Sequence, residues 1–288
     1  MVSKEVQKRI RQIEIHTKRL LSGSLVGQSS SAVKGAGFEF DQIRVYQPGD
    51  DVRFIDWKSS ARSTSLMTRQ YIEERSRTII LAVDISASSF FGSSTAAKYT
   101  MMSEIAAVLA LVAEVSKDHV GLLLFANKVH LFVPPNSGRK HVRYILEQLF
   151  SVTPKQETTS VAAALEHIAR LHLKNVVAFF ISDFISAPFD RPLSVVAKRY
   201  ELIAVRCLDV RETSFDPIGF LPVMDMESGE QATLNVRRKK GKTNLFLTER
   251  LHEQNRLFRK YAVDMLQIQA DQPYMQEMVR FFKKRLLY

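Results

Sequence analysis

The chain has little cysteine, little tryptophan and no long apolar run. Its 288 residues include one cysteine, Cys207, and one tryptophan, Trp57. A single cysteine excludes a disulfide framework and is typical of proteins that stay in a reducing compartment. The apolar stretch 105–113 ends at Glu104 and Glu114, so it is too short to span a bilayer, and no signal-peptide pattern opens the chain. We therefore expect a cytoplasmic protein with no transmembrane segment.

Positive charge is in excess. The chain has 41 lysines and arginines against 30 aspartates and glutamates, a formal net charge of +11. Such an excess is compatible with binding nucleic acid or an anionic membrane. The basic residues gather in three separate stretches, at 4–19, 237–242 and 283–285. The stretch 237–242 lacks interleaved aromatic residues and any recognition motif, so we expect no specific nucleic-acid binding and keep it as an alternative.

Apolar strand-like runs alternate with helical patterns along most of the chain. The strand-like runs lie at 78–83, 119–126, 129–133, 175–181, 201–207 and 265–268. The helical patterns lie at 3–22, 97–115, 139–150, 161–171, 193–200, 245–261 and 274–287. Continuous apolar runs are typical of strands buried on both faces. The alternation predicts an α/β fold with a doubly wound, mostly parallel sheet.

Two segments interrupt this alternation. Residues 36–75 contain short strand-like runs at 38–45, 53–57 and 66–71, and residues 208–244 contain prolines, turns and short extended runs. We expect both segments to form one small β-rich annex. The predicted organisation is an N-terminal helix and loop (1–35), the first part of the annex (36–75), the α/β domain (76–207), the second part of the annex (208–244), and a helix, strand and helix that complete the α/β domain (245–288).

Oxygen-bearing side chains follow or precede the predicted strands and helices at three places. Asp84, Ser86 and Ser88 follow the first buried strand, Thr159 precedes a helix, and Asp183 follows a later strand. Because open parallel sheets bind ligands at the carboxyl ends of their strands, we expect these side chains to meet. Two carboxylates and three hydroxyls suit Mg²⁺, with Mn²⁺ or Ca²⁺ as alternatives. A second interpretation is that the two serines only cap the next helix.

The same residues resemble a known site. The sequence DISAS at 84–88, Thr159 in TSVAAAL and Asp183 in ISDF are similar to the metal-ion-dependent adhesion site of von Willebrand factor A domains. The stretch GFEFDQIRVYQPGDDVRFIDWKSSAR at 37–62 resembles the signature of the family called domain of unknown function 58.

The resemblance carries expectations about function. It implies a von Willebrand factor A-like fold and a metal-dependent protein-interaction module rather than an enzyme. Members of this family are commonly found with MoxR-type AAA ATPases. The implied partner is such an ATPase, or another protein that presents an acidic side chain to the metal, in a chaperone-like or maturation role.

The signature stretch contains four charged residues, Asp50, Asp51, Arg53 and Asp56, that are candidates for partner binding. An internal network of ion pairs is the alternative interpretation. We expect Trp57, next to them, to be a packing residue.

An enzymatic function is the alternative, because some enzymes also place an aspartate after a first buried strand. Phosphotransferases of the haloacid-dehalogenase type use such an aspartate as nucleophile, with a second aspartate two residues on as general acid. Here that second position is Ser86, and no particular lysine can be assigned to the phosphate. A Mg²⁺-dependent phosphotransferase therefore remains an alternative to the binding function.

Overall fold

This computed structural model describes residues 4–20, 38–73, 76–90, 98–153, 157–209, 220–224, 231–235, 242–270 and 272–286. The chain divides into two units. Residues 23–76 form one, and residues 1–22 with 77–288 form the other. Each unit is described by itself below.

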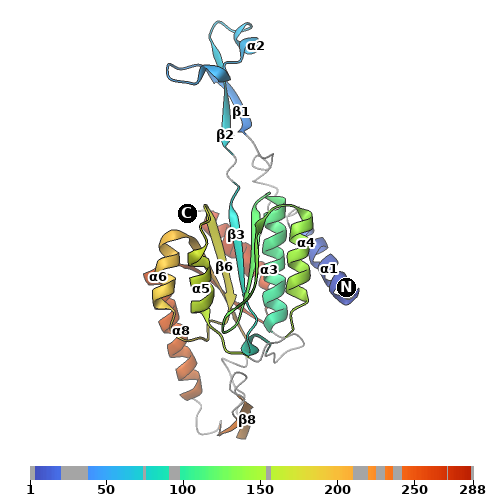
Figure 1. The fold of residues 1–288 in the computed structure, drawn as a ribbon, viewed down its shortest axis with the longest axis vertical. Coiled ribbons are helices and arrows are strands. Elements are labelled where there is room, and N and C mark those ends of the chain that lie inside the picture. Colours follow the sequence, from blue (N-terminus) through green and yellow to red (C-terminus); the bar gives the residue numbers. More distant parts are fainter. Residues whose placement is uncertain are drawn as a thin grey trace. The chain divides into compact units, whose positions relative to one another are not determined.

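The larger unit is built on one sheet (Figure 1). Within the described residues six strands form it, in the order β10-β7-β6-β3-β4-β5. Their bounds are β3 Thr78–Asp84, β4 His119–Phe125, β5 Val129–Asn136, β6 Val176–Ser182, β7 Glu201–Leu208 and β10 Asp264–Gln269. Neighbouring strands are parallel except at the edge, where β5 runs antiparallel to β4. The predicted mostly parallel sheet is confirmed.

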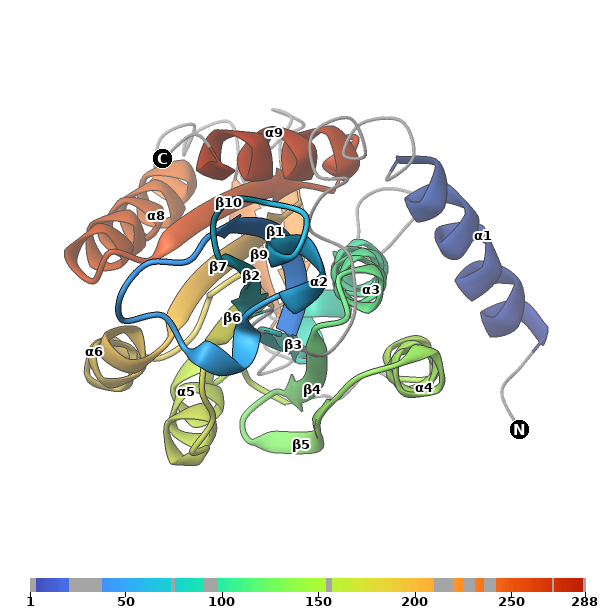
Figure 2. The ribbon, with the colours of Figure 1, turned by 90° about the horizontal axis from the view of Figure 1, so that it is seen from above.

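Helices cover both faces of this sheet (Figure 2). One face carries α1 Lys4–Leu20, α3 Lys98–Val115, α4 Arg139–Phe150 and α9 Tyr274–Leu286. The other face carries α5 Val161–Arg170, α6 Asp190–Arg199 and α8 Lys242–Lys260. The doubly wound arrangement is therefore confirmed. None of the helices in the described ranges is long and apolar enough to cross a membrane.

Strand β3 shows why its sequence is a continuous apolar run. Leu81 and Val83 belong to the core on the α3 face, whereas Ile80 and Ala82 belong to the core on the α5 face. Alternate residues of a strand point to opposite faces, and here both faces are covered. Each large apolar side chain buried in this way contributes about 1.5–3 kcal/mol to folding.

The strand order reverses beside β3. The chain passes from β3 to β4 on one side, and α5 then leads into β6 on the other side. In open α/β sheets the crevice for ligands lies at such a switch point, outside the carboxyl ends of the strands. The ends of β3 and β6 are therefore the places to look for a site.

The smaller unit is a hairpin with a folded tip. Strands β1 Phe38–Val45 and β2 Met67–Glu73 pair in antiparallel fashion. Between them lie a 3-10 turn, η2 Val52–Phe54, and a short helix, α2 Trp57–Ser60. The predicted strand at 53–57 is therefore wrong, because the only extended pairing in that stretch is one bridge between Ile55 and Thr68.

Trp57 was also expected to pack, and it does not. Its side chain is 68% exposed, because a unit this small has little interior in which to bury an indole.

The second half of the expected annex is a separate sheet. Strands β8 Phe220–Met224 and β9 Gln231–Asn235 pair only with each other, and β1 pairs only with β2 among the described residues. Within the described residues, the two segments expected to form one annex therefore contain two separate two-stranded sheets. Strands β8 and β9 are grouped with the α/β unit.

Candidate metal centre

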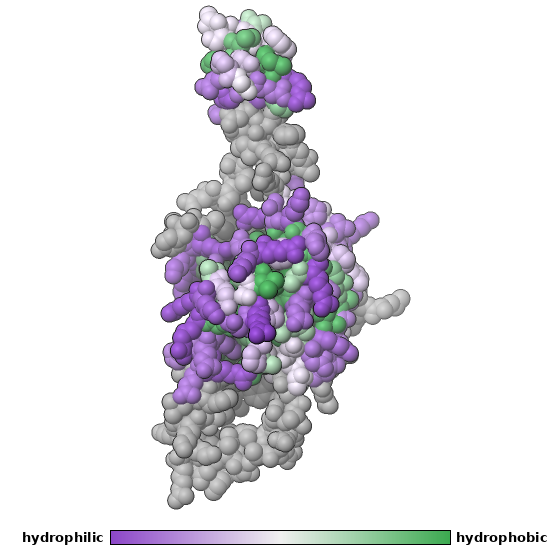
Figure 3. Space-filling view, turned by 60° about the vertical axis from the view of Figure 1, so that its left-hand side comes forward, coloured by the Kyte–Doolittle hydropathy of each residue, from purple (hydrophilic) through white to green (hydrophobic). Residues whose placement is uncertain are grey.

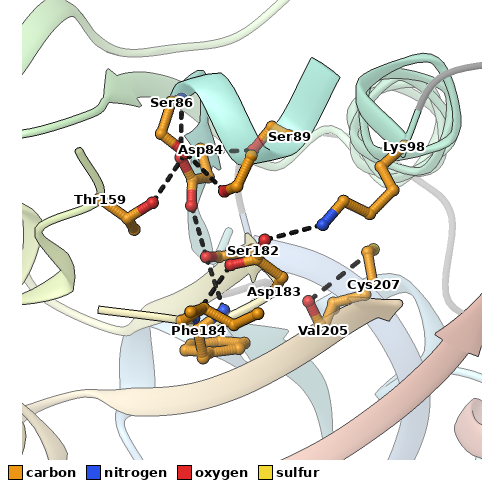
Figure 4. A network of polar contacts seen from close by, with 12 residues as sticks. Asp84, Ser86, Ser89, Lys98, Thr159, Ser182, Asp183, Phe184, Val205 and Cys207 are labelled. Carbon is orange, nitrogen blue, oxygen red and sulfur yellow. Dashed lines mark hydrogen bonds and ion pairs between the residues drawn. The ribbon is translucent and has the colours of Figure 1, made fainter. Parts of the chain in front are cut away.

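The carboxyl ends of β3 and β6 bring two aspartates together (Figure 4). Asp84 is the last residue of β3 and Asp183 follows the last residue of β6. The two strands are neighbours, with Val83 paired to Ile181. Both carboxylates have no solvent exposure. The topological switch point is thus lined by two fully buried acidic groups that come from distant parts of the sequence.

The turn after β3 presents hydroxyls beside Asp84. The backbone N–H of Ser86 donates to Asp84 Oδ1 at 2.9 Å, which fixes the direction of the turn. Ser86 Oγ then lies 3.2 Å from Ser88 Oγ and 3.4 Å from Ser89 Oγ. Ser86 and Ser89 are buried, whereas Ser88 is partly exposed. Ser88 is therefore the member of this hydroxyl cluster that solvent reaches.

Thr159 arrives from the loop before α5. Its Oγ1 donates to Ser86 Oγ at 2.7 Å. The loop is held in place because Ser160 N–H donates to Ala126 O at 2.8 Å, just beyond β4. Ser160 also caps α5, since its side chain accepts from Ala163 N. The structure thus joins the predicted threonine to the predicted serines.

Ser182, which the sequence analysis did not single out, links the two strand ends. Its Oγ donates to Asp84 Oδ2 at 2.6 Å and accepts from the N–H of Phe184 at 2.9 Å. Phe184 has a φ of 59°, which is unusual for a residue with a side chain. Its ring is buried and lies 5.2 Å from the ring of Phe258, and this packing stabilises the turn. The turn in turn places Asp183, whose Oδ1 accepts from Ile185 N at 2.9 Å.

Lys98 is the second residue that sequence reasoning missed. It is the first residue of α3, and its Nζ lies 2.8 Å from Asp183 Oδ2. Both side chains are fully buried. Long charged side chains are almost never fully buried unless they are paired. The available signal was that Lys98 is the only basic residue in a mostly apolar helix, 98–115.

Burial and charge shift the acidity of this site. Loss of solvation, and next the negative charge of Asp183, raise the pKa of Asp84 to about 6, while hydrogen bonds from Ser182 and Ser86 oppose the rise. Burial also raises the pKa of the nearby Cys207 thiol. Cys207 is fully buried in β7, as expected for a small apolar side chain, and is therefore unreactive.

The four charged residues of the hairpin tip make local contacts. Asp50 pairs with Arg44 at 2.6 Å, Asp51 with Arg53 at 2.6 Å, and Asp56 with Arg69 at 2.9 Å. These ion pairs agree with the structural interpretation. Partner binding by Asp50, Asp51, Arg53 and Asp56 stays a prediction. The basic stretch 237–241 lies outside the described residues.

A comparison with protein families now identifies the chain's relatives. The family described as "Protein of unknown function DUF58" matches residues 42–255. The chain belongs to this family. The resemblance drawn from the sequence is thereby confirmed.

Two proteins illustrate the range of similarity to this DUF58 protein. The uncharacterized protein Rv1480 of Mycobacterium tuberculosis is 29% identical over 282 residues, covering 96% of this chain and 88% of that protein. The uncharacterized protein YeaD of Bacillus subtilis is 30% identical over 137 residues, 47% of this chain and 31% of YeaD.

Similar solved structures share little sequence. The conserved hypothetical protein BatB from Bacteroides thetaiotaomicron has 11% identity and a TM-score of 0.47, covering 74% of this chain and all of that chain. The VWA domain of SpRpn10 has 12% identity and a TM-score of 0.35, covering 46% of this chain and 76% of that domain.

The side chains of this DUF58 protein fit a hard divalent cation in one respect and oppose it in another. Asp84, Asp183 and the hydroxyls around Ser86 are oxygen donors of the kind that Mg²⁺ prefers. No group of three or more His, Cys, Asp and Glu residues gathers within the described ranges, so a cation here would depend on the hydroxyls. The ammonium of Lys98, however, already neutralises one oxygen of Asp183.

Proposed function

We propose that this DUF58 protein is a metal-dependent protein-interaction module whose site holds Mg²⁺. The ligands would be Asp84, Ser86, Ser88, Thr159 and Asp183. One observation carries the proposal: these five oxygen donors come from three separate segments and converge at the switch point of the sheet. Mn²⁺ or Ca²⁺ would use the same hydroxyl and carboxylate oxygens.

The charge of the site favours an acidic ligand. Bound Mg²⁺ would supply a coordination position for a carboxylate from a partner protein. Asp84 and Asp183 contribute two negative charges, Lys98 contributes one positive charge, and the hydroxyls are neutral. A divalent cation therefore leaves a net positive site, which attracts a carboxylate. Ser88 is the partly exposed side of the cluster and marks where that carboxylate would approach.

The partner we propose is a MoxR-type AAA ATPase, in a chaperone-like or maturation role. Support comes from the chain's membership of the DUF58 family, because the resemblance to that family implies such a partner. Specificity would come from the surface next to the site, where the segment 184–190 follows Asp183. Pro188 and Asp190 of that segment, with Glu249 and Glu253 of α8, line an open groove of about 450 Å³.

Titration calorimetry with Mg²⁺ tests the metal site. Wild type should bind the ion, and Asp84→Ala should lose measurable heat while keeping the fold, since it removes a donor at the end of the sheet. Glu147→Ala is the matched control, because Glu147 is a carboxylate on the surface of α4 and should leave binding unchanged. Equal heats from wild type and Asp84→Ala would refute the metal site.

The phosphotransferase alternative gains one observation, the lysine beside the carboxylates. One feature weighs against it: the position of the general acid is occupied by Ser86. We propose that the protein is not an enzyme. Mg²⁺-dependent hydrolysis of an aryl phosphate that Asp84→Asn abolishes would overturn this proposal.

A further inference from the structure

The position of Lys98 suggests how the candidate metal centre is controlled. Within the part of the chain that the structure describes, its ammonium forms an ion pair with Asp183, one of the two buried aspartates. It comes from the first turn of α3, and 85 positions of sequence separate it from Asp183. The contact exists only because α3 packs on the face of the sheet next to β3 and β6.

We propose that Lys98 is a built-in competitor of the metal ion: its ammonium neutralises Asp183 when no metal is bound, and Mg²⁺ must bind against it. This inference rests on the proposed metal site and adds its regulation. Each oxygen of Asp183 already has a partner: Oδ1 accepts from the backbone N–H of Ile185, which belongs to the turn, and Oδ2 accepts from the ammonium of Lys98. A cation that binds Asp183 through Oδ2 therefore competes directly with the ammonium.

Two consequences follow from this geometry. Without metal, the ion pair removes the penalty of burying Asp183 as an unpaired charge, so the protein folds without a cation. With metal, the ammonium repels the incoming ion across a site that excludes water, which weakens metal binding. The lysine thus lowers the affinity for metal and makes the metal-free state stable.

Lys98→Met, which keeps the length of the side chain and removes its charge, tests both consequences. In EDTA its midpoint of thermal unfolding should fall by about 10 °C, because Asp183 is left buried and unpaired. Added Mg²⁺ should then raise the midpoint of Lys98→Met more than that of wild type. By calorimetry the variant should bind Mg²⁺ at least about tenfold more tightly than wild type.

Matched variants separate this effect from general damage. Lys140→Met removes an exposed lysine from α4 and should change neither the midpoint nor the Mg²⁺ affinity. The double variant Lys98→Met with Asp183→Asn should recover stability in EDTA and bind no Mg²⁺. If Lys98→Met does not fold, Lys98→Gln offers the same test, because glutamine can still donate a hydrogen bond but carries no charge.

The outcomes distinguish this inference from the proposed function. Equal Mg²⁺ affinities in wild type and Lys98→Met would overturn the competitor and leave the metal site standing. Binding by the variant alone would support the competitor and overturn metal dependence in the natural protein. If neither protein binds Mg²⁺ and Mg²⁺ does not restore the stability of Lys98→Met, both proposals fail and Lys98 is the permanent cation of the site.

Discussion

Asp84, Asp183 and Lys98 place a net negative charge in a part of the protein that excludes water. The ammonium of Lys98 pairs with Asp183, whereas the carboxylate of Asp84 is compensated only by hydrogen bonds from Ser86 and Ser182. Hydrogen bonds offset only part of the cost of burying a charge. This imbalance is the reason that the pKa of Asp84 is raised to about 6.

The raised pKa predicts that ionised Asp84 lowers the stability of the metal-free protein, and that this loss depends on pH. The folded pKa of Asp84 lies above the usual value of 3.8, so the protonated side chain favours the folded state. This contribution to stability is fully present below about pH 4 and is lost as pH rises through about 6. Asp84→Asn mimics the protonated form and should therefore exceed wild type in stability at about pH 7.5, by about 1–3 kcal/mol.

Urea unfolding in EDTA measures this difference. It should shrink as pH falls through about 4 and vanish at about pH 3, where Asp84 of wild type is mostly protonated in both the folded and the unfolded states. A variant that is less stable than wild type at both pH values would show that the carboxylate is not penalised, and that its hydrogen bonds outweigh its burial.

The residues of the site differ in how far the sequence reveals them. Asp84, Ser86, Thr159 and Asp183 could be predicted, because each lies within a few residues of a strand end or helix start and strand ends meet at one edge of the sheet. Lys98 could not, because its contact with Asp183 depends on the packing of α3, which no local pattern specifies.

At the scale of elements, local hydrogen bonds explain why the strand predicted at 53–57 does not form. Residues 53–57 contain apolar and aromatic side chains that favour a strand. Asp51, however, accepts from Arg53 N, and Asp56 accepts from the N–H groups of Lys58 and Ser59, which starts the helix α2. Aspartates that bond their own backbone in this way compete with strand pairing. The long strands of the sheet had no such competitor, and their apolar runs predicted them well.

The contacts of Asp56 predict its effect on the hairpin unit. Its side chain is nearly buried, caps α2 and pairs with Arg69, so Asp56→Ala should lower the unfolding midpoint of this unit. Trp57 is the only tryptophan and lies next to it, so intrinsic fluorescence reports the hairpin selectively.

Asp51→Ala provides the comparison for that measurement. Its partner Arg53 is 81% exposed at the side chain, and exposed ion pairs contribute little to stability. Asp51→Ala removes this exposed pair and one bond to Arg53 N, and should therefore lower the fluorescence transition less than Asp56→Ala does. If both variants shifted it equally, the capping role assigned to Asp56 would be wrong.

At the scale of the whole molecule, the distribution of hydrophilic and hydrophobic side chains on the surface does not by itself indicate one function. The α/β unit displays mostly hydrophilic side chains on the face shown in Figure 3, with hydrophobic residues scattered among them. The hairpin unit exposes several large apolar side chains of its own, Val45, Val52, Trp57 and Leu66. Two surfaces are therefore candidates for receiving a protein partner: the candidate metal centre at the carboxyl ends of β3 and β6, and the hairpin tip.

We expect the partner to bind at the candidate metal centre, and the test is whether binding depends on the metal ion. Co-purification of a MoxR-type AAA ATPase with this protein should require Mg²⁺ and be lost in excess EDTA. Ser86→Ala with Ser88→Ala should weaken it at least about tenfold, because in the proposed site these hydroxyls would hold the ion that receives the partner's carboxylate. Val52→Ala with Trp57→Ala removes apolar surface from the hairpin tip and should leave binding intact.

The opposite pattern, binding that survives EDTA and fails in the hairpin variant, would place the docking surface on residues 38–73. The site between β3 and β6 would then hold the strand ends together without contacting the partner, a task that Ser182 and Lys98 already perform through Asp84 and Asp183.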